Sequence, residues 1–319
     1  PMLAGRGLAH TGGTIDKLES IPGYKTALSL TEFQNIVETV GISIMEQTEE
    51  ICPADRKIYA LRDVTNTVAS NPLICGSIMS KKIAEGIQGL VLDIKVGNGA
   101  FMKTISEAKE LGDLLKTVGK LYGLKVTPIF TDMNQPLGNC AGLWCEVLES
   151  VECLQGNGPS DLMEVVYHLG IEALKIAGIK NPIELLKSNI ENGSAFEKFI
   201  EMVFAHGGNL DGLNNPRLHK PKFKKEILAQ EEGFVTQMNT LQLGLAVVQM
   251  GGGRIHKGDE IDNSTGIRFH KKIGVMVEKE EPILEYFCSN PSKFKKGGDL
   301  LKNIFTIQPN KPNIPNLFY

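Results

Sequence analysis

The chain has 319 residues, of which 42% are hydrophobic and 22% are charged, a composition typical of a folded globular protein. Its 34 basic and 37 acidic residues give a formal net charge of −3, which favours neither nucleic acid nor an anionic membrane as a partner. No apolar run approaches the roughly 20 residues that cross a bilayer. The six cysteines form no CxxC pair. In a chain of this length they indicate free thiols of a reducing compartment, so we expect a cytoplasmic protein.

A glycine-rich stretch, residues 5–19, lies near the start of the chain. Thr14 is placed to cap a helix that begins at Ile15. The free backbone N–H groups at such a helix start, with the hydroxyl beside them, favour an anion such as phosphate. A structural turn followed by an ordinary helix cap explains the same residues.

The segment that begins at residue 71 predicts a helix, with Asn71 as its N-cap and Pro72 at its first position. Ser77 and Lys81 are four residues apart and therefore share one helix face. A hydroxyl and an ammonium one turn apart can grip a polar, planar ligand. The alternative for Lys81, which a second lysine follows, is a solvated helix end.

A strand–helix–strand pattern comes next. Residues 90–94 form an apolar run of the kind that is buried in a parallel sheet. Thr104 and Glu107 have the spacing of a helix capping box, Gly123 is the expected end of that helix, and residues 126–131 predict a second strand. A crossover of this kind belongs to a parallel sheet that is covered by helices.

The remaining chain predicts more helices and then a change of structure. Further helices are expected over residues 160–177, 182–192 and 193–206. After about Pro221, glycines, valines and short alternating runs indicate a separate α+β unit. The lysine-rich tail, residues 293–311, is expected to be a solvated surface and a fraying end.

Several segments carry a family resemblance. They are residues 5–19, 53–56, 59–65, 77–82, 93–102, 131–138, 156–159 and 251–254. Together they closely resemble the thymidine and pyrimidine-nucleoside phosphorylases, over nearly the whole chain. The sequence Ser-Ile-Met-Ser-Lys-Lys at residues 77–82 is more similar to the broad-specificity pyrimidine enzymes than to the strict thymidine enzymes.

The resemblance implies a pentosyltransferase that catalyses reversible phosphorolysis of thymidine, uridine or deoxyuridine to the free base and (deoxy)ribose 1-phosphate. It implies that Arg62 and Lys81 are the catalytic, base-binding pair, with Ser77 beside them and Tyr59 lining the same pocket. Two fixed cations and a hydroxyl suit this reaction, because the pyrimidine gains negative charge as the glycosidic bond breaks. Thr14 matches a phosphate ligand of the family, and no covalent intermediate is required.

The resemblance also implies ligands and partners. Inorganic phosphate is the co-substrate, and no organic cofactor is expected. A structural cation, potassium, would have among its ligands the backbone oxygens of Leu137 and Cys140 and the Glu149 carboxylate. The family's other ligands would precede residue 1, so we expect this site to be incomplete here. The family forms homodimers, and neither nucleic acid nor a membrane is expected as a partner. The family's main phosphate loop, Lys-x-Ser-x-Gly-Gly, would precede residue 1, and Ala4 stands where a serine is usual, so we expect the N-terminal portion of the family to be missing.

The fold that the resemblance implies is α/β. It has a large α/β domain with a mainly parallel sheet at residues 1–53 and 87–220, and the remnant of a small helical domain at residues 54–86. The helical remnant carries the base-binding residues, and a C-terminal α+β domain covers residues 221–319. In the family, substrates bind in the cleft between the helical and α/β domains, and closure is needed for chemistry.

Two other interpretations stay open at this point. A phosphoribosyltransferase on the same fold, such as the anthranilate enzyme, would need a pyrophosphate and magnesium site, and the set of Arg62, Ser77 and Lys81 argues against it. The second is a catalytically silent fragment or pseudoenzyme that binds pyrimidines or a partner without turnover. The absent loop and Ala4 favour this second alternative.

Overall fold

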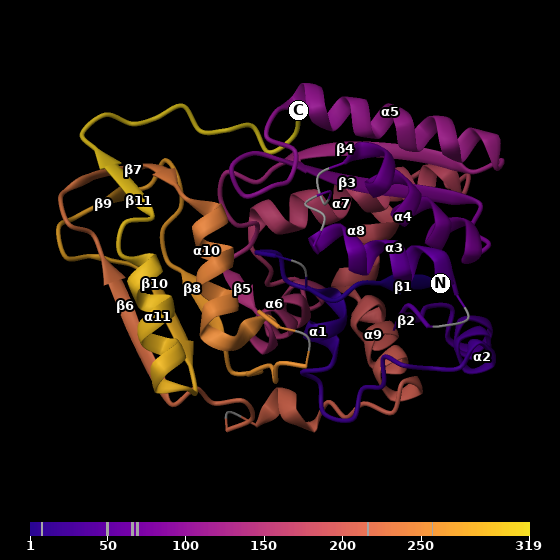
Figure 1. The fold of residues 1–319 in the computed structure, drawn as a ribbon, viewed down its shortest axis with the longest axis horizontal. Helices are drawn as coiled ribbons and strands as arrows, with labels where there is room; N and C mark the ends of the chain where they lie inside the picture. Colours follow the sequence, from indigo (N-terminus) through magenta and orange to yellow (C-terminus); the bar gives the residue numbers. More distant parts are fainter. Residues whose placement is uncertain (8, 49–50, 65–66, 68–69, 216, 257) are drawn as a thin grey trace.

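The computed structural model describes residues 1–319 except 8, 49–50, 65–66, 68–69, 216 and 257, and at residues 56, 59–61, 63–64 and 214 it describes the backbone alone. The described part confirms an α/β fold with parallel strand pairs (Figure 1).

The elements before residue 220 are β1 (Met2–Ala4), α1 (Thr14–Leu18), α2 (Leu30–Val40), β2 (Ile44–Glu46), α3 (Pro53–Val64), α4 (Asn71–Ala84), β3 (Gly89–Val96), α5 (Ile105–Leu121), β4 (Lys125–Asp132), β5 (Cys140–Gly142), α6 (Trp144–Leu154), α7 (Ser160–Ile176), α8 (Pro182–Glu191), α9 (Ser194–Ala205) and the short 3₁₀ helix η1 (Asp211–Asn214). The later elements are β6 (Phe223–Leu228), β7 (Gly233–Met238), α10 (Thr240–Val247), the π-helical turn η2 (Val248–Gly252), β8 (Gly266–Phe269), β9 (Met276–Val277), β10 (Pro282–Cys288), α11 (Pro291–Leu301) and β11 (Phe305–Gln308).

The parallel crossover that the sequence predicts is confirmed. β3 and β4 pair in parallel along their whole lengths, with α5 between them in the chain. The Thr104 hydroxyl accepts from the N–H of Glu107 at 3.3 Å, and the Glu107 carboxylate accepts from the N–H of Thr104 at 3.2 Å. This is the expected capping box. Gly123, with a φ of +72°, follows the end of the helix, as its freedom to adopt a left-handed conformation allows.

Helices cover both faces of this strand pair. α5 packs against one face, with α4 against α5, and α7 packs against the other. Gly89 of β3 lets α7 approach, because a Cβ there would lie 2.3 Å from Cγ2 of Ile176. The apolar cluster on the α5 face includes Met79, Leu90, Ile94, Leu111 and Leu115. The alternation of Gly89 and Leu90 between the two faces is the period of two that a strand imposes.

Two predicted helix starts are wrong by one residue. α1 begins at Thr14, with Gly13 as its N-cap and no side-chain cap bond. A Cβ at Gly13 would lie 2.1 Å from the nitrogen of Gly7, so only glycine fits where the loop closes on itself, and the threonine falls inside the first turn. α4 begins at Asn71, with Ser70 as the N-cap. The proline that follows is tolerated because N–H groups of a first turn have no intrahelical partner.

Two antiparallel sheets form the C-terminal part, coloured orange to yellow in Figure 1. Their strand orders are β5-β8-β10-β6 and β11-β7-β9. β5 precedes residue 220 in the chain and the other strands follow it, so the first sheet joins the two parts of the molecule. Side chains of α10, α11 and both sheets share one apolar core, which includes Val235, Leu243, Ile267, Leu284 and Leu301.

The expectation of a fraying end is wrong for most of residues 293–311, whereas the expected solvated surface is confirmed for exposed lysines such as Lys295, Lys296 and Lys302. Residues 293–301 form most of α11, and residues 305–308 form strand β11, which pairs with β7. Two glycines bring α11 close to the core: a Cβ at Gly297 would lie 2.2 Å from Cγ of Met250, and one at Gly298 would lie 2.4 Å from the hydroxyl of Tyr286. The lysines of this segment occupy the outer face of an amphipathic helix.

The last residues return to the α/β part. The N–H of Tyr319 donates to the carbonyl of Phe130 at 3.1 Å, and its hydroxyl donates to Oδ1 of Asp132 at 2.9 Å. In Figure 1 the yellow segment crosses from the C-terminal sheets to the end of β4. None of the helices in the described part of the chain is both long and apolar enough to cross a membrane.

Candidate active site

α3 and α4 carry the residues that were expected to bind a pyrimidine. The Lys81 ammonium on α4 donates to Oδ2 of Asp55 on α3 at 2.7 Å and to the hydroxyl of Ser77 at 2.9 Å. The side chains of Lys81 and Asp55 are 17% and 8% exposed. The hydroxyl and the ammonium therefore share one helix face, as the spacing predicts, and the charged group is held between two acceptors largely away from water.

Arg62 belongs to the same helix–helix interface. Arg62 is 5% exposed, and its Nη1 donates to the carbonyl of Leu73, in the first turn of α4, at 3.4 Å. Arg62 lies seven residues after Asp55 on α3, so both project from one face of that helix. The side chain of Tyr59 lies outside the described residues. A planar guanidinium, an ammonium and a hydroxyl at one interface are suitable donors for the oxygens of a planar ring.

The glycine-rich loop closes on itself before Thr14, whose side chain is exposed in the first turn of α1. The carboxylate of Asp16 holds the loop, since Oδ2 accepts from the N–H of Gly7 at 2.8 Å. Its Oδ1 pairs with Arg6 at 3.1 Å and with Arg254 at 2.6 Å. Because the Asp16 side chain is 2% exposed, its charge is balanced by these groups rather than by water.

Arg6 connects the loop to two further acids. It pairs with Glu19 and with Glu46, each at 2.7 Å. Hydrogen bonding to Glu19 raises the pKa of Arg6. Burial raises the pKa of Glu19, but hydrogen bonds from Arg6 and Thr26 outweigh burial and hold that pKa below its usual value. The start of the loop is thus fixed by a network of charged groups.

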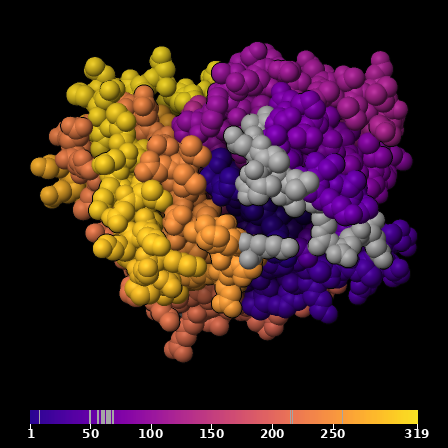
Figure 2. Space-filling view, in the orientation of Figure 1, coloured from indigo at the N-terminus to yellow at the C-terminus, as the bar shows by residue number. Residues whose placement is uncertain are grey.

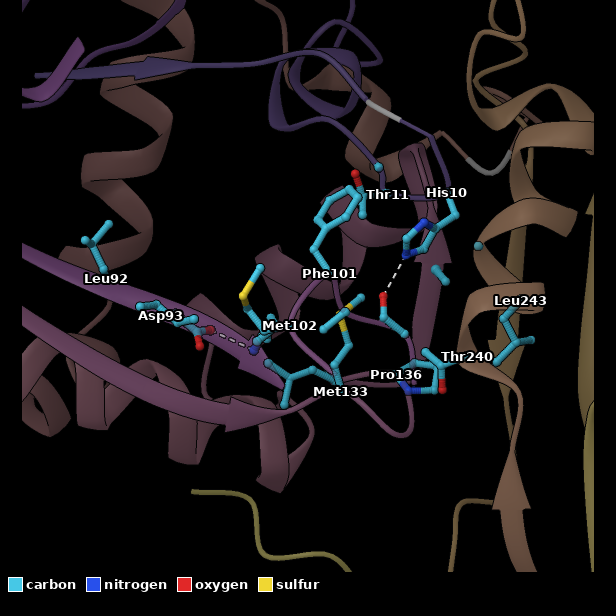
Figure 3. Close-up of a pocket in the computed structure, with 18 of the residues that line it drawn as sticks. His10, Thr11, Leu92, Asp93, Phe101, Met102, Met133, Pro136, Thr240 and Leu243 are labelled. Carbon is cyan, nitrogen blue, oxygen red and sulfur yellow. Dashed lines mark hydrogen bonds and ion pairs between the residues drawn. The ribbon is translucent and has the colours of Figure 1, made fainter. Parts of the chain in front are cut away.

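A mainly apolar cavity of about 510 Å³ lies beside the glycine-rich loop. Figure 3 shows Phe101 and His10 with Met133 and Thr240 below them, and Leu243 at the right of the view. The ring Nε2 of His10 lies 2.7 Å from the carbonyl of Gly99. Because a carbonyl only accepts, this nitrogen carries the proton and donates it.

α4 presents different faces to the cavity and to α3. Ile74 and Ile78 line the cavity, whereas Ser77 and Lys81 bond toward Asp55 on α3. The structure therefore brings the expected base-binding residues together at the α3–α4 interface and not in the wall of the large cavity.

The carboxylate that was expected to hold a cation lies beside the turn that follows Leu137. Glu149 on α6 is 5% exposed, and its Oε1 accepts from the N–H of Asn139 at 2.7 Å. Leu137 and Cys140, on either side of that turn, line the cavity. Burial raises the pKa of Glu149, against the opposing effect of amide hydrogen bonds from Asn139 and Cys140. Within the described residues, no group of three or more His, Cys, Asp and Glu side chains is placed to hold a metal ion.

Sequence reasoning missed three charged residues of these sites. Asp55 could have been found, because it precedes Arg62 by two helical turns in α3. Asp16 and Arg254 could not, because 238 residues separate them and neither has a local partner that marks the pair.

The comparisons with known proteins identify the family of the chain. Residues 1–196 match the model of the glycosyl transferase family, a/b domain, and residues 234–308 match the pyrimidine nucleoside phosphorylase C-terminal domain. The chain is 44% identical over 287 residues to the pyrimidine-nucleoside phosphorylase of Staphylococcus haemolyticus and 42% identical to that of Staphylococcus aureus (strain bovine RF122 / ET3-1). Each match covers 88% of this chain and 66% of the relative, so the chain spans slightly less than two thirds of the relatives' length. The chain belongs to the glycosyl transferase family, within the group formed by the pyrimidine-nucleoside phosphorylases.

Proposed function

We propose that this chain binds pyrimidine nucleosides and acts in their reversible phosphorolysis, with thymidine, uridine and deoxyuridine as substrates and the free base and (deoxy)ribose 1-phosphate as products. The observation that carries the proposal is the position of the Lys81 ammonium, which lies between Ser77 on α4 and Asp55 on α3. Arg62 lies on the same face of α3 as Asp55 and bonds to the first turn of α4. The names of the related proteins support the same substrate class.

The proposed roles follow from the charge that develops in the reaction. Arg62 and Lys81 donate to the oxygens of the pyrimidine and stabilise the negative charge that the ring gains as the glycosidic bond breaks. Ser77 orients the ring, and a base-binding role of Tyr59 belongs to the proposal on the family resemblance alone. Asp55 acts through Lys81, because its 2.7 Å ion pair fixes where the ammonium can point.

The phosphate is the nucleophile of the proposed reaction. The hydroxyl of Thr14 binds one phosphate oxygen, and another oxygen forms the new bond to C1′ of the pentose. The bond from C1′ to the ring nitrogen breaks, and its electron pair leaves with the pyrimidine. Positioning of the two substrates supplies much of the acceleration, since oriented reactants avoid much of the entropic cost of meeting in solution.

We also propose a monovalent cation, potassium, at Glu149 and the backbone carbonyls of Leu137 and Cys140. The residues fit such an ion, because a buried carboxylate whose pKa is raised by burial has charge that a cation would offset, and hard oxygen ligands suit it. Its role is structural: it would hold the turn between β4 and β5. The homodimeric state and the lack of an organic cofactor belong to the proposal on family grounds alone, and the cytoplasmic location on the free cysteines.

The test is phosphate-dependent release of thymine from thymidine and of uracil from uridine. Wild-type chain is compared with Lys81→Met and with Lys175→Met, a control that removes a lysine from an exposed pair in which Lys175 is 57% exposed. By comparison with other groups that stabilise developing charge, Lys81→Met should lower kcat by about 10²–10³-fold. The control should keep wild-type activity.

Binding separates the proposal from its alternative. If the wild-type chain releases no base but binds uracil in isothermal titration, and Lys81→Met does not, the chain is a pyrimidine-binding protein without turnover. If neither release nor binding occurs, the assignment of the α3–α4 interface to pyrimidines is wrong.

A further inference from the structure

An arginine of the C-terminal part, Arg254, forms an ion pair with Asp16 beside the glycine-rich loop. Arg254 follows the π-helical turn η2, and its Nη1 lies 2.6 Å from Oδ1 of Asp16. The arginine side chain is 28% exposed and the aspartate side chain 2%. The contact thus joins a partly exposed cation of the C-terminal part to a buried anion of α1. In Figure 2, orange atoms of the C-terminal part adjoin indigo atoms of the N-terminal region along this face.

Charge balance makes Arg254 more than an additional contact. Arg6 is the other guanidinium at Asp16, but it also pairs with Glu19 and Glu46. Without Arg254, three carboxylates would share one guanidinium. Because the Asp16 carboxylate is removed from water, loss of a cation partner there costs far more than loss of a surface ion pair.

Asp16 passes this constraint directly to the loop backbone. Its Oδ2 accepts from the N–H of Gly7 at 2.8 Å, while its Oδ1 receives Arg254. The same carboxylate therefore holds the loop at one oxygen and the C-terminal part at the other. Close packing at Gly13, which is pressed against Gly7, carries the position of the loop to Thr14, the next residue.

The backbone that presents Arg254 is itself fixed. The carbonyl of Gly251, which has a φ of +103°, accepts from the N–H of Asp262 at 2.9 Å. The Asp262 carboxylate in turn accepts from the N–H of Ser289 at 2.6 Å, at the end of β10. The arginine is therefore anchored to the C-terminal sheet and not carried on a free loop.

We propose that Arg254 is a positioning residue for phosphate: through Asp16 it holds the glycine-rich loop in the shape that places Thr14 for the anion. This rests on the proposed function in one respect, the identity of the ligand as inorganic phosphate. The guanidinium does not touch the phosphate. Its effect is on the loop, and the loop sets the affinity.

The experiment measures amide hydrogen exchange over residues 5–16, with and without inorganic phosphate, in wild type, Arg254→Met and Arg254→Lys. Lys224→Met is the matched control, because it removes a cation of the same C-terminal part from an exposed pair in which Lys224 is 70% exposed. We expect Arg254→Met to raise exchange of the loop amides by about tenfold, as loss of a charged hydrogen bond would. Arg254→Lys should restore part of the protection because it keeps the charge, and the control should match wild type.

Steady-state kinetics provides the second measurement. The KM for phosphate should rise by about tenfold in Arg254→Met, while the KM for the nucleoside changes by less than about twofold. Equal rises in both constants, or loop exchange no faster than in Lys224→Met, would overturn the inference. If the wild-type chain does not release base at all, the proposed function fails separately, and loop exchange with its response to inorganic phosphate still decides the role of Arg254.

Discussion

The ion pair between Asp55 and Lys81 gives the most direct test of the α3–α4 interface. Lys81→Met leaves the Asp55 carboxylate, 8% exposed, without its cation. Breaking a buried pair in this way typically costs about 3–5 kcal/mol, and the partial exposure of Lys81 places the expected loss at the lower end, about 3 kcal/mol. Asp55→Asn should cost less, about 1–2 kcal/mol, because the ammonium keeps Ser77 and can move toward water.

The double variant Asp55→Asn with Lys81→Met should be more stable than Lys81→Met alone, because no unpaired charge remains buried. We expect it to lose about 1–2 kcal/mol, which corresponds to a coupling energy of about 2–4 kcal/mol between the two positions. Urea unfolding measures these differences. At a slope of about 3 kcal/mol/M, a loss of 3 kcal/mol lowers the midpoint by about 1 M.

Two results would refute the reasoning on this pair. One is a Lys81→Met chain within about 0.5 kcal/mol of wild type, which is the range of a surface substitution. The other is strict additivity of the two single variants. Lys175→Met, at an exposed pair on α7, is the control and should change stability by less than about 0.5 kcal/mol.

Three further predictions concern other parts of the molecule. Burial lowers the pKa of His206, so on acidification this histidine is protonated in the unfolded chain before it is protonated in the folded chain, and the free energy of unfolding should fall below about pH 6.5. Between pH 7 and 5, the melting temperature of His206→Asn should therefore change less with pH than that of wild type. The control His256→Asn, at a side chain that is 82% exposed, should keep the wild-type slope. Burial raises the pKa of Glu149, so its ionised form destabilises the fold as the pH rises above about 4.3. A bound potassium ion would offset that charge. The melting temperature of wild type should therefore be higher in potassium chloride than in choline chloride, and that of Glu149→Gln should be the same in both salts. Gly13→Ala should cost about 1–3 kcal/mol in urea unfolding through overpacking, because its Cβ would lie 2.1 Å from a backbone nitrogen, whereas Gly5→Ala, with nothing within 4 Å, should be neutral.

Local signals made the β3–α5–β4 crossover predictable. The capping box of Thr104 and Glu107 and the glycine after the helix are encoded within a few residues, so their structure does not depend on the rest of the chain. The contact of Ser77 with Lys81 is of the same kind, because four residues on one helix always bring side chains together. The start of α1 differs for a reason that is not local: Gly13 is required by the close approach of Gly7, which only the folded loop creates.

The long-range features could not be predicted in the same way. A run of lysines indicates a solvated tail. In α11, however, Phe294, Gly297 and Leu301 share one helix face, and this face packs against the C-terminal core. The sequence of the helix alone does not show which core it packs against. The pair of Asp16 and Arg254 is similar. Each residue alone has the pattern of an ordinary surface charge, and only the fold shows that the aspartate is buried and that its neutralising group comes from the other end of the chain.

The C-terminal part is best understood as part of the site's scaffold, because it is bonded to the loops where ligands are expected. Loops at the carboxyl ends of parallel strands are the usual ligand-binding positions of an α/β fold, and here they follow β3 and β4. The N–H of Thr240 donates to Oδ1 of Asn98 in the first loop at 2.8 Å, and the Thr240 hydroxyl donates to the carbonyl of Asn134 in the second at 2.8 Å. One residue of α10 thus bonds to both loops, which are also bonded directly to each other through Asn98 and Asn134. Arg254 does the same for the glycine-rich loop, so all three loops share one support whose position is set by the C-terminal core.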